Sequence, residues 1–359
     1  MWQMNKTRVI LFFILLIFFV PNLFADESSE LKIAGWDVYA DPEHPDKTIG
    51  YESFEKKTGI NIKFKPLSNL DDIVNLAESD EHFDLFIISN EGIKILHDMG
   101  LVEPVNLQKL PNYQNLHHNL KYSEWSQFNS RVYAVPWAWG PTGLMYNKDL
   151  INNPDSWNVL WNPKYRGKVA MWDDVSMIWT TALALGYKNV YSLTRAQLDK
   201  VKNKLFEFNK LQAHYYKGGG EELSLVKKGQ LVAYNSWYDP SARLKAAGKN
   251  FAMTIPKEGA VGMFDSFMIS KNAHHKDLAH QYVNHQIDPA IQQQMVKITG
   301  LAPSNIETLG LLKAEEIRAL HLDDPDYFNR MILWDHMPRK NLYDEVLNAV
   351  RQDSRQKQR

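Results

Sequence analysis

The sequence predicts an α/β protein of two domains with a cleft between them. Short runs of strand-forming residues alternate with amphipathic helical stretches, which is the pattern of an α/β fold. The chain has 359 residues and is 44% hydrophobic, so it can bury a large core, and its length favours two domains over one. We find no internal repeat.

The first third of the chain contains three successive strand–helix units. Gly59 follows a helical stretch with a basic last turn, and glycine commonly ends a helix because it adopts the left-handed conformation without strain. The periodicity of apolar residues predicts, in order, a strand over 31–36, a helix over 51–58, a strand over 60–64, a helix over 70–78 and a strand over 83–88.

The rest of the chain continues the alternation and becomes mostly helical in its last third. Residues 351–359 are polar and charged, and we expect them to fray. The predicted elements are strands over 132–136 and 143–146 at a change of domain, a strand over 168–171, a helix over 197–211, and strands over 231–235, 251–255 and 267–269.

The N-terminus predicts export. Lys6 and Arg8 precede an unbroken apolar run over 9–20, and Ala25 stands where a signal peptidase would cleave, so residues 1–25 are predicted to be a cleavable signal peptide. The run is shorter than the roughly 20 apolar residues that span a bilayer, although an uncleaved anchor is the alternative. The absence of cysteine excludes a disulfide framework and a lipid-modified cysteine. We therefore expect a protein of the Gram-negative periplasm.

Composition and motifs give no sign of nucleic-acid binding, metal binding or catalysis. The 41 basic and 42 acidic residues leave a net charge of −1, and no basic stripe with interleaved aromatics is present. The pairs His117-His118 and His274-His275 lack the spacing that places two ligands on one helix face. Because no nucleophile has a matching base, we expect no enzyme, no metal and no cofactor.

Large apolar residues stand beside acids at five places. Carboxylates accept hydrogen bonds from an ammonium group, and aromatic faces cover its methylenes, each cation–π contact contributing roughly 0.5–2 kcal/mol. The pattern favours a site for an organic cation, although eleven tryptophans would also meet some acids by chance. The places are Trp36-Asp37, Trp172-Asp173-Asp174, Trp237-Tyr238-Asp239, Phe264-Asp265 and Trp334-Asp335.

A series of motifs, in this order, resembles the periplasmic polyamine-binding proteins of bacterial ABC importers. The motifs include residues 54–60, 135–143, 161–168, 256–260, 264–266 and 300–305. The resemblance implies a type II solute-binding fold, with a ligand cleft between two lobes joined by a hinge. It implies lobe one over 26–136 and 258–310 and lobe two over 137–257 and 311–359, with crossings near Pro136 and Pro256.

The resemblance also implies the ligand-binding residues. Asp174 and Asp265 are expected inside the closed cleft, and Asp239 and Asp335 at its rim. Glu91 stands near an expected aromatic residue; it either favours the N-terminal end of a helix or replaces a carboxylate missing at Val38 or Met177. The complete set is Trp36, Asp37, Tyr39, Ser89, Glu91, Asp174, Trp237, Asp239, Asp265, Trp334 and Asp335.

The function implied is capture of a linear polyamine of the spermidine, norspermidine and putrescine class by a monomer that presents it to a membrane ABC permease. One alternative is a sensor that regulates a membrane signalling receptor, such as a cyclic-di-GMP enzyme controlling biofilm formation. A periplasmic hydrolase is a less favoured alternative. The sequence does not decide between an importer component and a sensor.

Overall fold

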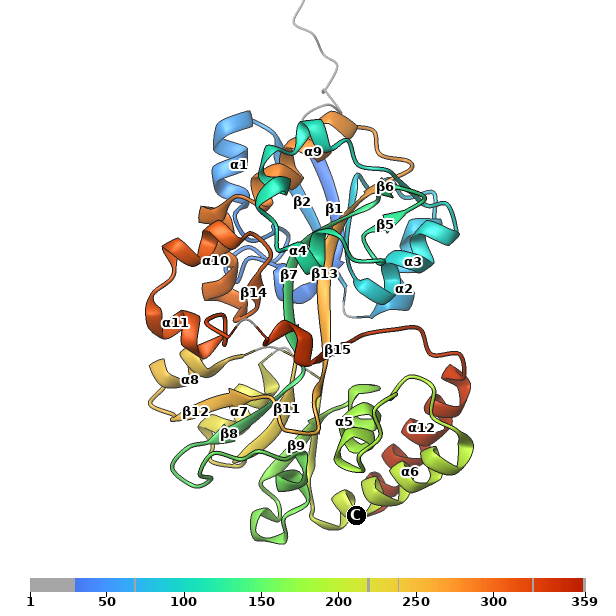
Figure 1. Ribbon diagram of the computed structural model, residues 1–359, viewed down its shortest axis with the longest axis vertical. Helices are drawn as coiled ribbons and strands as arrows, with labels where there is room; N and C mark the ends of the chain where they lie inside the picture. The colour runs from blue at the N-terminus through green and yellow to red at the C-terminus, as the bar shows by residue number, and fades with distance from the viewer. Residues whose placement is uncertain (1–29, 68, 218–219, 238, 325, 358–359) are drawn as a thin grey trace, which may run out of the picture.

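The protein is a two-lobed α/β structure (Figure 1). The computed structural model describes residues 30–67, 69–217, 220–237, 239–324 and 326–357. The predicted signal peptide, residues 1–25, lies outside the described residues. Each lobe is built on its own sheet, so the lobes can move against each other only through the segments that connect them.

The first lobe is built on a sheet that has eight strands among the described residues. Its order is β14-β7-β13-β3-β1-β2, with β15 and β4 also paired to β13. β1 is parallel to β2 and β3, whereas β13 is antiparallel to β3 and β7. The strands are β1 (Glu30–Trp36), β2 (Asn61–Leu67), β3 (Leu85–Ser89), β4 (Val102–Glu103), β7 (Ala134–Pro141), β13 (Ala260–Ser270), β14 (Ala302–Pro303) and β15 (Met331–Leu333).

The second lobe is built on a five-stranded sheet with the order β10-β9-β11-β8-β12. In Figure 1 the long strands β7 and β13 run side by side from the first lobe toward this sheet. The strands of the second lobe are β8 (Gly143–Asn147), β9 (Val169–Trp172), β10 (His214–Tyr216), β11 (Ala233–Ser236) and β12 (Phe251–Thr254); β5 (Gln127–Phe128) and β6 (Arg131–Val132) form a separate pair.

Helices cover both sheets (Figure 1). Around the first sheet lie α1 (Tyr51–Thr58), α2 (Leu70–Glu78), α3 (Asn90–Asp98), α4 (His118–Lys121), α9 (Lys276–Gln286) and α10 (Pro289–Thr299), with α11 (Ala314–Ala319) below α10. Around the second sheet lie α5 (Ser176–Ala184), α6 (Arg195–Lys210), α7 (Glu221–Lys227), α8 (Ser241–Ala246) and α12 (Lys340–Lys357). Within the described residues, none of the helices is long and apolar enough to cross a membrane.

Two helices of the first lobe have the ends that the sequence predicts, whereas most other predicted elements differ by one to three residues at their ends. α1 and α2 cover the predicted residues, and Gly59 ends α1 with a φ of 73° while its N–H donates to the carbonyl of Glu55. Asn69 caps α2 by accepting a hydrogen bond from the N–H of Asp72. These local signals act within a few residues, so the sequence contains them.

The two central strands are longer than the sequence predicts. β7 was expected to end at Pro136 and continues to Pro141, and β13 begins at Ala260 rather than at Phe267. Every residue of both strands is buried, so neither shows the alternation by which a half-buried strand is recognised. Pro136 is tolerated because the pairing with β13 shifts register beside it, between Asp265 and Ser266.

The C-terminal segment is a packed helix, and the expected fraying of 351–359 is wrong as far as Lys357. α12 lies along α6 of the second lobe (Figure 1). Tyr343, Val346, Leu347 and Val350 are buried against the second-lobe core, and Arg351 forms an ion pair with Asp173. The apolar stripe ends at Val350, and polar contacts hold the turns that follow, including a hydrogen bond from the Asn209 amide to the Asp353 carboxylate at 2.7 Å.

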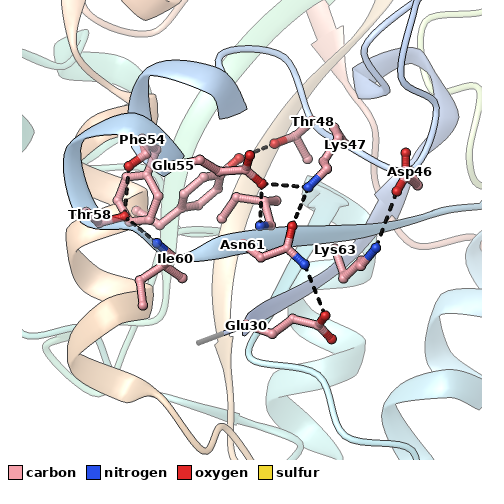
Figure 2. Close-up of polar contacts among 12 residues, drawn as sticks. Glu30, Asp46, Lys47, Thr48, Phe54, Glu55, Thr58, Ile60, Asn61 and Lys63 are labelled. Carbon is pink, nitrogen blue, oxygen red and sulfur yellow. Dashed lines mark hydrogen bonds and ion pairs between the residues drawn. The ribbon is translucent and has the colours of Figure 1, made fainter. Parts of the chain in front are cut away.

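A polar network fixes the loop that follows β1. Figure 2 shows the Lys47 ammonium between the side chains of Glu55 and Asn61, at 2.6 Å and 2.5 Å. The same Glu55 oxygen accepts the N–H of Ile62 at 2.8 Å, which ties α1 to β2. The N–H of Ile49 donates to the carbonyl of Tyr39 at 3.0 Å. The network therefore holds the loop that begins with the aromatic pair Trp36 and Tyr39.

Candidate functional site

One buried carboxylate lies in the first lobe. Asp265 of β13 is 2% exposed and accepts hydrogen bonds from the indole Nε1 of Trp36 at 3.1 Å and the hydroxyl of Tyr39 at 2.5 Å. Burial raises the pKa of Asp265 to about 6, and hydrogen bonds from Tyr39, Ser89 and Trp36 oppose the rise. Within the described part of the chain, no cation pairs with Asp265, so its ionised form is costly.

Strand pairing brings these four residues together. Asp265 pairs with Ser89 across the antiparallel β13–β3 ladder, and β3 in turn pairs with β1. Trp36 ends β1, and Tyr39 lies in the single 3-10 turn that follows. The register shift after Asp265 changes the face toward which the next residue of the strand points.

The second lobe holds a matching carboxylate on the turn between β9 and α5. Asp174 accepts hydrogen bonds from the indole Nε1 of Trp237 at 2.9 Å and from the N–H of Ser176 at 2.8 Å, and it also accepts the Ser176 hydroxyl. Burial raises the pKa of Asp174 to about 6, against the hydrogen bonds from Ser176 and Trp237. Asp174 therefore stabilises the start of α5 and also presents an oxygen to a tryptophan.

Two tryptophans lie between the lobes, and a third, Trp179 of the second-lobe core, packs against them. The rings of Trp237 and Trp334 are stacked with centroids 5.3 Å apart and planes at 24°, and Trp179 meets Trp334 edge-on at 5.2 Å. Trp237 and Trp334 both pack against the cores of the two lobes. The indole N–H of Trp334 is buried and donates to none of the described residues, so a polar hydrogen at this interface lacks a partner.

Glu91 lies in the first turn of α3, immediately after Ser89 and Asn90. Its Oε2 atom is enclosed and accepts no hydrogen bond from the described residues. Burial raises the pKa of Glu91 to about 8; Lys340 opposes the rise, and Asp71 and Asp335 add to it. A carboxyl group in this environment holds a proton at neutral pH.

Asp239 is buried, contrary to the expectation that it lies at a rim. It is 7% exposed and accepts the N–H of Ser241 at 2.8 Å, and burial raises its pKa while His321 opposes the rise. The reason is a close approach of α10, since a Cβ placed on Gly300 would lie 2.2 Å from the Asp239 carbonyl oxygen. Sequence spacing could not reveal this contact.

The two remaining predicted residues are exposed. Asp335 accepts a hydrogen bond from the N–H of His336 at 2.6 Å, and its side chain is open to solvent. Asp37 begins the 3-10 turn between Trp36 and Tyr39 and is also exposed. Among the described residues, neither forms a hydrogen bond or ion pair with Asp265 or Asp174, so the structure does not bring all eleven predicted residues into one cluster.

Several positioning residues escaped sequence reasoning. The Asn90 amide donates to the carbonyl of Trp334 and accepts the N–H of Phe264 at 3.2 Å, which links Trp334 to the strand of Asp265. Asn235 accepts the N–H of Trp172 at 2.7 Å beside the Asp174 turn. Of these positioning residues, only Ser176 has a signal in the sequence. It stands two residues after Asp174, and an acid followed two residues later by a serine is a common start of a helix.

A small cavity lies where the lobes meet, beside this cluster. It encloses about 10 Å³, which is close to the space that one water molecule needs. Trp237 and Gly300 both line it, and Gly300 lies next to the backbone of Asp239. Its lining is Trp139, Gly140, Pro141, Trp237, Met253, Gly300, Leu301, Ala302, Leu320 and Tyr327. A chain of several methylenes therefore needs the lobes or the tryptophans to move.

The chemistry of the site suits an organic cation. Buried carboxylates with raised pKa values become ionised when a positive group enters, and indole rings cover methylenes at the same time. Among the described residues, no group of three or more His, Cys, Asp and Glu side chains is arranged to hold a metal ion. The acids are instead distributed one by one along the lobe interface.

The chain matches the family model described as bacterial extracellular solute-binding protein over residues 51–309. It is 24% identical over 303 residues to the spermidine/putrescine-binding periplasmic protein of Escherichia coli K12, covering 81% of this chain and 82% of that protein. It is 26% identical over 310 residues to the putrescine-binding periplasmic protein PotF of the same organism, with coverage of 81% and 82%.

Solved structures share the fold. A putative spermidine/putrescine ABC transporter from Listeria monocytogenes superposes with a TM-score of 0.77 at 23% identity, covering 90% of this chain and 99% of the other. The spermidine/putrescine ABC transporter substrate-binding protein PotD from Streptococcus pneumoniae gives 0.75 at 20% identity, with coverage of 91% and 99%. These likenesses establish the two-lobed architecture.

Proposed function

The chain belongs to the family of bacterial extracellular solute-binding proteins, and from this premise we propose that it captures a linear polyamine between its lobes in the periplasm. One observation carries the proposal. Each lobe holds a carboxylate removed from bulk solvent, the buried Asp265 and the half-buried Asp174, and each carboxylate accepts the indole N–H of a tryptophan. The names of the relatives, which are spermidine- and putrescine-binding periplasmic proteins, support the same ligand class.

Two ammonium groups on one ligand match two carboxylates on two lobes. An ammonium that leaves water needs acceptors, and a buried carboxylate needs a positive partner, so each offsets the cost of burying the other. Trp36, Trp237 and Trp334 would cover the methylenes between the amines. A ligand with the wrong spacing leaves one charge unpaired, and this penalty gives selectivity.

The lobes would close on the ligand as rigid bodies. We propose that lobe one comprises residues 26–136 and 258–310 and lobe two 137–257 and 311–359, with movement at the connections between them. The structure supports two independent sheets, although β7 continues in the first sheet to Pro141 and β15 joins β13. A ligand that binds the closed form better shifts the population toward it.

Calorimetry of the mature protein with putrescine, spermidine, norspermidine and spermine tests the ligand class. We expect binding of at least one of them in the micromolar range or tighter, which corresponds to about 8 kcal/mol. Absence of heat and of thermal stabilisation with all four, together with binding of an amino acid or a sugar, would refute the proposal.

The membrane partner that we propose is an ABC permease, in keeping with the relatives' structures described as parts of ABC transporters. Deletion of the gene should abolish high-affinity uptake of the radiolabelled polyamine, and the intact gene should restore it. Unchanged uptake combined with altered biofilm formation would replace the importer role by regulation of a membrane signalling receptor.

A further inference from the structure

Glu91 is a half-buried acid outside the pair Asp174 and Asp265. Its Oε2 atom is enclosed by protein and accepts no hydrogen bond from the described residues. Ser89 rather than Glu91 occupies the N-cap position of α3. A carboxyl that served only the positive end of the helix would remain ionised. Burial instead raises the pKa of Glu91 to about 8, which favours the protonated form at neutral pH.

The charged and titratable groups around Glu91 come from four elements. Asp71 lies in the first turn of α2, Lys340 begins α12, Asp335 precedes α12, and Tyr191 follows α5. The Lys340 ammonium forms its ion pair with Asp344 at 3.2 Å. Two acids and a phenol thus interact electrostatically with Glu91, and the Lys340 ammonium, which opposes the two acids, is also paired with Asp344.

The two residues that precede Glu91 connect its segment to both halves of the proposed site. On one side, Ser89 donates to Asp265, and Asn90 bonds the N–H of Phe264. Asn90 also donates to the carbonyl of Trp334, whose ring stacks on Trp237.

From the second lobe, the Tyr191 hydroxyl donates to the carbonyl of Ile332 at 3.1 Å, two residues before Trp334. Asp335 directly follows Trp334 in the chain, and its charge raises the pKa of Glu91, so the two acids lie near each other beside the Trp334 segment.

Resting on the proposed function, we propose that Glu91 and Asp335 form a third ammonium subsite that favours triamines over diamines, and that Glu91 releases a proton when the subsite is filled. The step is balanced. The Glu91 carboxyl loses its O–H proton to solvent, and the ammonium keeps all its protons and donates hydrogen bonds to the resulting carboxylate. Putrescine fills only the positions at Asp174 and Asp265 and leaves the Glu91 proton in place.

Calorimetry at pH 7 in two buffers of different ionisation enthalpy measures the protons released. A group with a pKa of about 8 is roughly nine-tenths protonated at pH 7, and one with a pKa of about 6 roughly one-tenth. Wild-type protein should therefore release about one proton with norspermidine or spermidine and roughly 0.2 with putrescine.

The variant Glu91→Gln should release roughly 0.2 proton with every amine. It should also bind triamines at least about fivefold more weakly while keeping putrescine affinity within about threefold. Asp335→Asn should weaken triamines in the same direction. Glu52→Gln, which changes an exposed acid in the first turn of α1, is the matched control and should change none of these values.

Three outcomes decide the inference. Equal proton release by wild type and Glu91→Gln during triamine binding overturns it and leaves the proposed function intact. Equal weakening of putrescine and triamines by Glu91→Gln also overturns it, since that pattern indicates a general effect of charge. Failure of wild type to bind any amine overturns the proposed function and the third subsite together.

Discussion

Asp265 and Asp174 lie in different lobes and are held by the same kinds of hydrogen-bond donor. In each case an indole N–H donates to the carboxylate and a hydroxyl-bearing residue supplies a further hydrogen bond, Tyr39 for Asp265 and Ser176 for Asp174. These donors keep the oxygens in place before the ligand arrives. A preorganised acceptor loses less conformational entropy when it binds an ammonium.

Replacing either acid should weaken binding strongly. Asp265→Asn and Asp174→Asn each leave an ammonium without its anionic partner in a closed site, which costs about 2–5 kcal/mol of binding energy. Asp335→Asn changes an exposed acid and should cost about 1 kcal/mol or less with putrescine. Calorimetry with putrescine checks the order, with circular dichroism as the control for folding. Similar affinities for all three variants would remove the two buried acids from the site.

Stability of the ligand-free protein should fall as the pH rises. The pKa values of Asp174 and Asp265 are raised to about 6 and that of Glu91 to about 8, so the folded state binds more protons than the unfolded state over this range. Their contribution is complete below the unfolded pKa values near 4 and is lost as the pH passes 6 and then 8. A bound polyamine should reverse the trend, because it favours the ionised forms.

Melting temperatures from pH 5 to pH 8.5 check this prediction. The difference between wild type and Glu91→Gln isolates Glu91, since the histidines whose pKa values are lowered by burial, His82, His117 and His285, are common to both proteins. We expect the two curves to diverge between pH 6.5 and pH 8.5, with wild type falling more steeply. Parallel curves would show that Glu91 is already ionised in the folded protein.

Residue identity predicted the chemistry of the site better than its geometry. Acid–aromatic neighbours pointed to Asp265 and Asp174, and in the structure both accept a hydrogen bond from a tryptophan N–H group. However, Tyr39 and Asp265 are 226 positions apart, and their contact depends on the pairing of three strands. The burial of Asp239 depends on Gly300 of another lobe. Such contacts arise from tertiary packing and leave no local pattern.

At the scale of elements, the end of α10 determines how closely the lobes approach. Gly300 ends α10 with a φ of 70°, and a Cβ there would lie 2.2 Å from the carbonyl oxygen of Asp239. The two backbones can approach this closely only because glycine has no Cβ.

Gly300→Ala should hinder closure of the lobes. Gly229→Ala is the matched control, because Gly229 has a φ of 73° and nothing within 4 Å of an added Cβ. Each variant should lose about 1–2 kcal/mol of stability from the left-handed conformation, but only Gly300→Ala should bind putrescine more than about tenfold less tightly. Small-angle scattering should show a larger radius of gyration for Gly300→Ala with ligand. Identical binding by the two variants would mean that this contact does not form in the bound state.

The C-terminal helix supports the Asp174 turn from outside. The Arg351 guanidinium donates to the carboxylate and the carbonyl of Asp173, at 2.7 Å and 2.9 Å. Arg351→Met should weaken putrescine binding roughly threefold to tenfold, because the ion pair is partly exposed and contributes about 1 kcal/mol. Arg355→Met changes an exposed arginine of the same helix and should leave calorimetric affinity unchanged. Equal putrescine affinities in the two variants would show that Arg351 contributes only to the packing of the helix and not to ligand binding.

Element boundaries were predictable where the signal is local and missed where burial is complete. α2 has a polar cap and an amphipathic period, and its predicted ends agree with the structure. β7 and β13 are buried at every position. They therefore lack an alternating pattern, and the sequence predicted only part of each strand. α12 extends beyond the predicted limit because Arg351 pairs with Asp173 and Asp353 accepts a hydrogen bond from Asn209 of α6, and a sequence pattern alone does not reveal these partners.

The whole molecule is two sheets joined by long central strands, with tryptophans filling the interface. Trp237 and Trp334 pack against both cores, and the cavity beside them encloses about 10 Å³. The lobes or the rings must therefore move before a polyamine enters. In the proposed function, a single ligand then bridges Asp265 of the first lobe and Asp174 of the second.

The most direct test compares putrescine with butylamine, which has the same carbon chain and one amine fewer. Titration calorimetry of the mature protein should give micromolar or tighter binding of putrescine, and butylamine should bind at least about a hundredfold more weakly, because one buried carboxylate stays unpaired. Equal affinity for the two amines would contradict the account, since a ligand with one ammonium group cannot bridge the acids of both lobes.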